Sequence, residues 1–166
     1  MAAAYWIKQM LDARGVPYIE RSHPEVFTSQ EVAHEEHVSG YRLAKVVVVM
    51  AAGRPVQLIV PACRRVVLDR VKHLLAAHDV RMASEAEMLE HFPDTEPGAI
   101  PPLRHGADVD VLMDASLWIE GDLLFQAGTH RDAIQMRFTD WILLVQPRVE
   151  FFTEPASVLN RIVCPH

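Results

Sequence analysis

The chain has 166 residues, of which 50% are hydrophobic and 23% are charged, as is usual for one globular domain. This composition excludes a disordered, collagen-like or low-complexity chain. Sixteen basic and 22 acidic residues give a net charge of −6, which argues against non-specific binding of duplex DNA. The sequence shows neither an apolar run long enough to span a membrane nor a secretory signal, so we expect a soluble, cytoplasmic protein.

Hydrophobic periodicity divides the chain into alternating helices and strands. Apolar residues three and four apart predict helices over residues 3–14 and 70–78, and helix-start signals predict helices over residues 28–37, 84–92 and 140–146. Apolar, β-branched runs predict strands over residues 16–20, 43–50, 56–60, 109–113, 117–120, 123–127 and 133–138. The pattern indicates one α+β domain over residues 1–166, with its core at about 3–151 and a short C-terminal tail.

Residues that commonly begin or end helices mark several boundaries. Capping boxes start at Thr28 and Ser84, each with a glutamate three residues later. Asp69 and Thr139 are candidate N-caps, and Gly15 is placed to end the first helix. These signals mark where the predicted helices start and where the first one ends.

The spacing of the histidines and cysteines indicates no binding site for a metal or a cofactor. His34 and His37 are three residues apart, whereas the metalloprotease helix needs four, and no third ligand is evident. Cys63 and Cys164 match no metal spacing, and we expect two free thiols. A nucleophilic Cys63 beside Arg64 remains an alternative that favours a thiol-dependent hydrolase.

Lys45 begins a strand that is otherwise apolar as far as Met50. Its aliphatic stem must therefore lie beside apolar surface. The ammonium either reaches water at the strand end or stands at the mouth of a pocket. In the second case it is available to a phosphate or to a developing negative charge. The sequence alone leaves both interpretations open.

Two glycine-containing loops are candidates for ligand contact. In Pro97–Pro102, a glycine permits close approach of a ligand, and the prolines stiffen the loop. In the second loop, a glycine and a threonine directly follow a predicted strand. The groups that could form hydrogen bonds with a ligand are the N–H groups of Gly98, Ala99 and Ile100, the N–H of Gly128 and the hydroxyl of Thr129. Ordinary tight turns are the alternative for both loops.

The order of the motifs is more specific than any single one. From the N-terminus they are Val16-Pro-Tyr18 with His23, Thr28-x-x-Glu-x-Ala33, Lys45-Val-Val-Val, Val60-Pro-Ala-x-Arg-Arg-Val-Val-Leu-Asp69, Glu96-Pro-Gly-Ala-Ile-Pro-Pro102, an Asp114-x-Ser/x-Leu stretch and Gly128-Thr. In this order and spacing they resemble the YbaK/prolyl-tRNA synthetase-associated domain family over nearly the whole chain.

The resemblance implies a single mixed, partly barrel-like β-sheet flanked by helices. It implies an aminoacyl-tRNA deacylase that hydrolyses the ester of mischarged tRNA in trans, without metal or cofactor. Lys45 and Gly98 are the implied catalytic residues, and Lys45 would anchor the terminal ribose and phosphate or polarise the carbonyl. The implied substrate-binding residues are His23, Phe27, Thr28, Ala99, Ile100, Pro101, Gly128 and Thr129.

The implied partners are a mischarged aminoacyl-tRNA and an aminoacyl-tRNA synthetase. Arg64 and Arg65 form the best local basic cluster for contact with the tRNA backbone, although a solvated turn is equally consistent with them. Neither a membrane nor duplex DNA is expected as a partner. The alternative function is a non-catalytic module of the same fold that binds tRNA or a synthetase.

Overall fold

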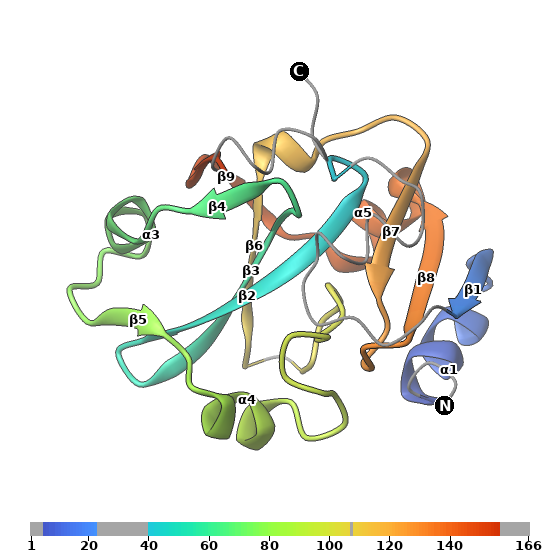
Figure 1. Ribbon diagram of the computed structural model, residues 1–166, viewed down its shortest axis with the longest axis horizontal. Helices are drawn as coiled ribbons and strands as arrows, with labels where there is room; N and C mark the ends of the chain where they lie inside the picture. Colours follow the sequence, from blue (N-terminus) through green and yellow to red (C-terminus); the bar gives the residue numbers. More distant parts are fainter. Residues whose placement is uncertain (1–4, 23–39, 107, 157–166) are drawn as a thin grey trace.

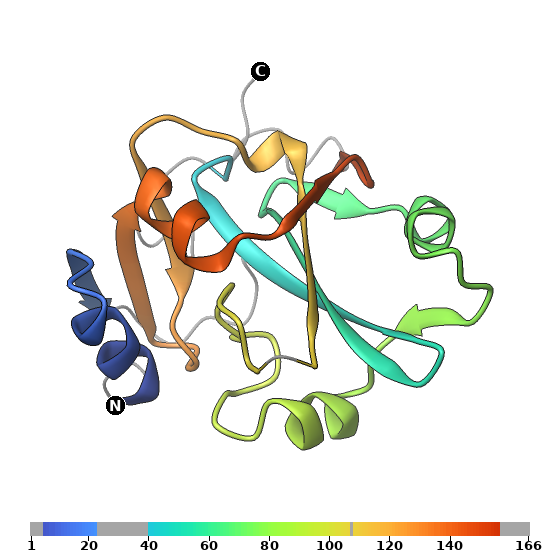
Figure 2. The same cartoon turned by 180° about the vertical axis from the view of Figure 1, so that it is seen from behind.

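The computed structural model describes residues 5–22, 40–106 and 108–156. A mixed β-sheet forms the centre of this part of the chain, and helices cover its faces (Figures 1 and 2). The helices are α1 (Tyr5–Ala13), α3 (Leu68–Leu75), α4 (Glu85–His91), α5 (Phe138–Val145) and a single 3₁₀ turn, η1 (Ala115–Leu117). The strands are β1 (Tyr18–Ser22), β2 (Leu43–Ala51), β3 (Arg54–Pro61), β4 (Arg64–Val66), β5 (Val80–Met82), β6 (Asp110–Asp114), β7 (Asp122–Gln126), β8 (Asp132–Arg137), β9 (Arg148–Glu150) and β10 (Thr153–Pro155).

The main sheet has the strand order β1-β8-β7-β2-β3-β6-β9, and β5 adds to β2. The pairs β2–β7, β3–β6 and β6–β9 are parallel, and the other pairs are antiparallel. The edge strands β1 and β9 do not pair with each other, so the sheet stays open. β4 and β10 form a separate two-stranded ribbon. The predicted α+β fold with one mixed sheet is confirmed.

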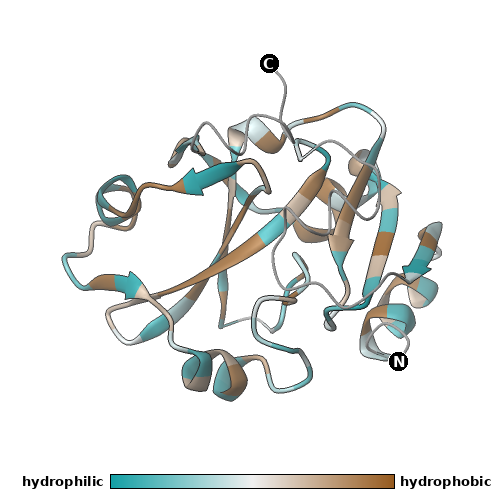
Figure 3. Cartoon of the chain, in the orientation of Figure 1, coloured by the Kyte–Doolittle hydropathy of each residue, from teal (hydrophilic) through white to brown (hydrophobic). Residues whose placement is uncertain are grey.

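The sheet separates two apolar clusters because successive side chains of a strand point to opposite faces. On one face, Ala44 and Phe125 pack with residues of α1 and α5. On the other, Val49 and Val60 pack with Val71 of α3. Figure 3 shows the central strands coloured mostly as hydrophobic, as expected for strands covered on both faces.

Several predicted boundaries are wrong. Residues 117–120 form no strand, because the carboxylate of Asp114 accepts a hydrogen bond from the Ser116 N–H and turns the chain into η1. Helices α3 and α5 begin before Asp69 and Thr139, so neither residue is an N-cap. The strands β4, β5, β9 and β10 were not predicted, since three residues carry no recognisable period.

Other boundary signals are confirmed. Ser84 and Glu87 form a complete capping box at the start of α4. Gly15 follows α1 with a φ angle of +63°, the left-handed conformation that commonly ends a helix. The predicted helix over residues 28–37 lies outside the described residues.

Strands β2 and β7 pair only briefly and then part. Their register joins Leu43 to Leu124 and Ala44 to Phe125. On the same edge of β2, pairing with β5 begins at Val49. The intervening edge, which begins at Lys45, pairs with no described strand. An unpaired edge in the middle of a sheet leaves room for a loop or a ligand.

Candidate functional site

Two loops form the centre of the candidate site, Glu96–Ile100 and Ala127–Arg131, and we call them the paired loops. The Gly128 N–H donates to the Ala99 carbonyl at 2.9 Å, and the Glu96 N–H donates to the Gly128 carbonyl at 2.8 Å. His130 adds two bonds, from its N–H to Glu96 Oε2 at 3.0 Å and between Nε2 and the Pro97 carbonyl at 2.9 Å. Because a carbonyl only accepts, His130 Nε2 carries the proton. Four hydrogen bonds therefore fix one loop against the other.

Gly98 is the exposed residue in the first of the paired loops. Its φ angle is +87°, a conformation that residues with side chains rarely adopt. A Cβ placed on it would lie 3.3 Å from His130 Cε1. No described residue accepts a hydrogen bond from the Gly98 N–H. The loop thus presents an available backbone donor where only glycine fits comfortably.

The three residues that follow Gly98 in the sequence are buried and do not face solvent. Ala99, Ile100 and Pro101 are buried, and the Ala99 N–H donates to the Glu96 carbonyl at 2.9 Å. The Ala99 N–H is therefore not available to a ligand, which corrects the expectation from the sequence. Ile100 packs instead with Val48 in a small apolar cluster.

Three side chains hold the proline end of the loop. Gln57 Nε2 donates to the Pro101 carbonyl at 3.3 Å, and His105 Nε2 lies at the same distance from that oxygen. Trp141 Nε1 donates to the Pro102 carbonyl at 2.8 Å. These bonds come from a strand, a loop and a helix, so the core itself sets the position of Gly98.

The side chain of Thr129 stabilises the turn in which this residue lies. Its hydroxyl donates to Asp132 Oδ2 at 2.6 Å and accepts from the N–H groups of Arg131 and Asp132 at 3.2 and 3.1 Å. With these three bonds the hydroxyl is fully used, so the turn interpretation of Thr129 fits the structure better than ligand contact. Gly128 beside it has a φ angle of +92°, as a tight turn requires.

Lys45 lies half-buried at the open edge of β2. It pairs with Val60 of β3, and alternation places its side chain on the face of Val47 and Val60. Burial lowers the pKa of Lys45, and no described carboxylate offsets this effect. The ammonium forms no hydrogen bond or ion pair with any described residue. A cation without a partner on an apolar face is a candidate ligand-binding group.

Lys45 and Ile100, the last residue of the first of the paired loops, lie on opposite faces of β2. Ile100 packs with Val46 and Val48, which point to the face opposite Lys45. The structure joins the loop of Gly98 directly to Gly128 and His130, and it records no bond between Lys45 and these residues. His23, Phe27 and Thr28, which the resemblance also assigns to the site, lie outside the described residues.

The sequence did not identify Gln126 as a candidate site residue. It ends β7, is 7% exposed, and its Nε2 has no hydrogen-bond partner among the described residues. The signal available in the sequence was a single amide in the apolar run Leu123–Ala127. His130 and Glu96 were also missed, because their role depends on a contact between segments more than 30 residues apart.

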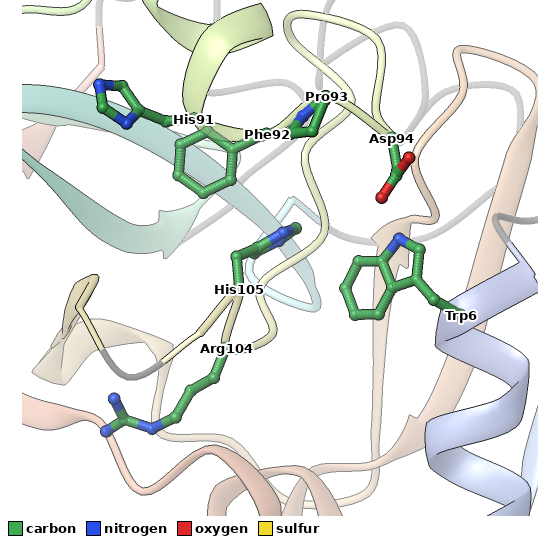
Figure 4. A pocket seen from close by; sticks show the side chains of 7 residues that line it. All are labelled: Trp6, His91, Phe92, Pro93, Asp94, Arg104 and His105. Carbon is green, nitrogen blue, oxygen red and sulfur yellow. The ribbon is translucent and has the colours of Figure 1, made fainter.

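A separate cavity of about 360 Å³ lies beside α1 (Figure 4). Its lining residues are Trp6, His91, Phe92, Pro93, Asp94, Arg104 and His105. The His105 ring is edge-on to Trp6 and Phe92, with centroid distances of 4.9 and 4.7 Å. Burial lowers the pKa of His105, which favours the neutral ring. Neither Lys45 nor Gly98 lines this cavity.

The predicted basic cluster, Arg64 and Arg65, contacts strand β10 through both of its side chains. Arg64 Nε donates to Thr153 Oγ1 at 2.7 Å, and Arg65 forms an ion pair with Glu154. These contacts tie β4 to β10 and partly neutralise the cluster. A role of Arg64 and Arg65 in binding the tRNA backbone stays a prediction.

The remaining candidate groups are metal-ligating side chains and the cysteines. In residues 5–22, 40–106 and 108–156, no group of three His, Cys, Asp or Glu side chains could hold a metal ion. His34, His37 and Cys164 lie outside these ranges. Cys63 is disulfide-bonded, so the prediction of a free thiol there is wrong. Among the described helices, none has the length and apolar character to cross a membrane.

Comparison with solved structures places the fold among known proteins. "Hypothetical protein APE2540" matches with a TM-score of 0.80 and 19% identity, covering 89% of this chain and 99% of that one. A structure described as "a putative trans-editing enzyme for prolyl tRNA synthetase" matches with a TM-score of 0.78 and 19% identity, covering 91% and 96%. At these identities the matches show the fold alone.

A family model gives the more specific result. The model of the aminoacyl-tRNA editing domain matches residues 23–144, well over half of the chain. The match spans Lys45 and both of the paired loops, and it agrees with the YbaK-like resemblance in the order of motifs. The chain therefore belongs to the aminoacyl-tRNA editing domain family.

Proposed function

We propose that the protein is an aminoacyl-tRNA deacylase that hydrolyses the ester of mischarged tRNA in trans. The observation that carries the proposal is Gly98, an exposed residue whose N–H has no acceptor in the described part of the chain and whose loop is fixed by four hydrogen bonds. A rigid N–H aimed at a carbonyl oxygen stabilises the negative charge that develops there when water attacks.

Lys45 supplies the second element of the proposed site. Its unpaired ammonium would anchor the terminal ribose and phosphate of the tRNA or polarise the ester carbonyl. A free ammonium on an apolar face is costly unless a ligand uses it. This cost favours a ligand-binding role over a purely structural one.

The proposed reaction uses no protein nucleophile. The attacking water adds to the ester carbonyl carbon, and the tetrahedral intermediate then expels the ribose oxygen, which takes up a proton. The products are the free amino acid and uncharged tRNA. An aminoacyl ester is already activated, so orientation of water and stabilisation of charge account for most of the required acceleration. The vicinal ribose hydroxyl of the substrate would position the water.

The proposed substrate and location follow from this activity. A mischarged tRNA is the partner, and a synthetase would release it to the editing protein. The amino-acid pocket would reject the correct residue by size, as a hydrolytic sieve does. We place the activity in the cytoplasm, where a protein acting on newly charged tRNA meets its substrate.

The test is a deacylation screen with purified protein and a panel of tRNAs, each charged with a correct or an incorrect amino acid. We expect faster release of amino acid from at least one mischarged tRNA and no effect on its correctly charged form. A 2′-deoxy terminal adenosine on that tRNA should slow the reaction. Failure to accelerate hydrolysis of any tRNA in the panel would contradict the proposal.

A further inference from the structure

Gln126 carries a buried donor that no described residue uses. The residue is 7% exposed, and its Nε2 makes no hydrogen bond within residues 5–22, 40–106 and 108–156. Burying an amide without a partner is unfavourable, and most buried amides in folded proteins are satisfied. An acceptor from a ligand would remove this cost.

Gln126 and Lys45 lie at the point where β7 and β2 part. The pairing of the two strands ends with Leu43–Leu124 and Ala44–Phe125, and Lys45 and Gln126 are the next residues of each strand, just beyond the last pair. Alternation puts both side chains on the face opposite Phe125, where their neighbours along the strands are Leu43 and Leu124. No hydrogen bond joins the two. Two polar groups without a hydrogen-bond partner among the described residues thus lie on the same face of the sheet, each one residue beyond the last β2–β7 pair.

Both groups are donors, and this limits what they bind. The Lys45 ammonium and the Gln126 amide N–H₂ each need an oxygen or another acceptor. The α-ammonium of an aminoacyl group is itself a donor, so it does not satisfy Gln126. The ligand group beside Gln126 therefore carries an acceptor.

We propose that Gln126 is a specificity-determining residue that donates a hydrogen bond to an oxygen on the side chain of the aminoacyl group. This inference rests on the proposed deacylase function. The amino acid is the terminal group of a charged tRNA, and the nucleic acid must stay outside the sheet. The amino-acid side chain is thus the part of the substrate that reaches a residue as buried as Gln126.

A site with a buried donor rejects ligands that lack the matching acceptor, because the donor then stays unpaired. The preferred substrate would carry a side-chain hydroxyl, amide or carboxylate oxygen. An apolar amino acid of the same size would be a poor substrate.

The test compares side chains that differ by one oxygen on the same tRNA, serine against alanine and threonine against valine. We expect wild-type kcat/KM to favour the hydroxyl member of at least one pair by about tenfold or more. Gln126→Met, which keeps the length of the side chain and removes the amide, should reduce this ratio to within about threefold of one. Gln135→Met is the matched control, because Gln135 on β8 already donates to Asp122 Oδ2 at 2.6 Å.

A second readout does not depend on activity. Removing an unpaired buried amide should raise the thermal midpoint of Gln126→Met by about 2–4 °C. A merely structural role for the amide predicts a lower midpoint instead, and that result would overturn the inference.

The possible outcomes distinguish the specificity role of Gln126 from the proposed deacylase function. If the wild type hydrolyses mischarged tRNA but Gln126→Met keeps the wild-type ratio, the specificity role is wrong and the deacylase proposal stands. Equal loss on both members of a pair would place Gln126 on the ribose or the carbonyl and also overturn the inference. If the wild type hydrolyses no tRNA, the proposed function fails and the inference falls with it.

Discussion

A side chain on Gly98 would begin 3.3 Å from Cε1 of His130, so the imidazole ring forms a wall beside the glycine. The same ring binds the Pro97 carbonyl through Nε2. His130 therefore both fixes the loop that carries Gly98 and limits the residue at that position to glycine.

We predict that Gly98→Ala lowers kcat/KM for deacylation by about tenfold to a hundredfold. The methyl group and the strained φ angle of +87° would displace the N–H from the substrate carbonyl. Gly53→Ala is the control, since Gly53 has a similar φ angle of +79° and nothing within 4 Å of an added Cβ. Both variants should lose about 1 kcal/mol of stability. Wild-type kcat/KM in Gly98→Ala would exclude the role of the loop.

Lys45→Met should lose activity and gain stability. We expect kcat/KM to fall by about a hundredfold, because a cation near the reacting ester is removed. The free energy of unfolding at pH 7 should rise by about 0.5–2 kcal/mol, because an unpaired charge leaves an apolar face. Lys72→Met on α3 serves as the control for loss of one positive charge.

The stability gain of Lys45→Met should depend on pH. Burial lowers the pKa of Lys45 in the folded protein, so the unfolded chain binds the proton more tightly. Wild-type stability should therefore rise with pH between the lowered pKa and the ordinary value of about 10.5. Denaturant unfolding should show the variant's advantage at pH 7 shrinking across that interval. An advantage that does not change with pH would argue against burial of the ammonium.

His130→Leu should reduce kcat by about tenfold or more with little change in KM, because the paired loops lose the bond to Pro97. His130→Gln retains a terminal N–H₂ at a similar distance from the backbone, so it should recover part of kcat. Steady-state kinetics on both variants checks this. Equal defects in the two variants would show that the hydrogen bond is not what positions Gly98.

Asp114 should stabilise the protein in a pH-dependent manner. Its carboxylate accepts from the N–H groups of Phe152 and Thr153 at 2.8 and 3.1 Å and from Ser116. Desolvation alone raises the pKa of Asp114, but the hydrogen bonds from Ser116, Phe152 and Thr153 together outweigh it, so the net shift is downward. We expect Asp114→Asn to cost about 2 kcal/mol at pH 7.

The sign of this effect follows from proton binding. With a lowered pKa in the folded state, the stabilisation by Asp114 is present above the unfolded value of about 3.9 and is lost as the pH falls below it. Urea unfolding at pH 7 and at pH 3 should therefore show a smaller difference between Asp114→Asn and the wild type at the lower pH. A larger difference at pH 3 would contradict the assignment.

Prolonged treatment with EDTA should leave deacylation unchanged. The groups assigned to the reaction are an ammonium and backbone N–H donors, and neither kind binds a cation. The rate of amino-acid release before and after chelation checks this. Activity that disappears with chelator and returns with zinc would implicate His34 and His37 instead.

Local signals in the sequence predicted the elements that position the site. The apolar run of β2 predicted a central strand with Lys45 near its start, and the capping box at Ser84 predicted α4. Gly98 was predicted from the composition of its loop alone. In each case the relevant residues are neighbours in the sequence.

Contacts between distant segments account for what could not be predicted. The bond from His130 to Pro97 joins residues 33 positions apart. That Gln126 and Lys45 share a face where β7 and β2 part depends on the register of two parallel strands, which no local pattern encodes. The sequence alone left the use of the Thr129 hydroxyl open, because its partner Asp132 satisfies the hydroxyl only when the turn closes.

The most direct test measures the first-order rate of amino-acid release from a mischarged tRNA with and without saturating protein, alongside tRNA binding under the same conditions. We expect release far above spontaneous ester hydrolysis, and we expect Lys45→Met and Gly98→Ala to abolish most of the increase. Tight tRNA binding with an unchanged ester lifetime would contradict this expectation and would identify a binding module instead of an enzyme.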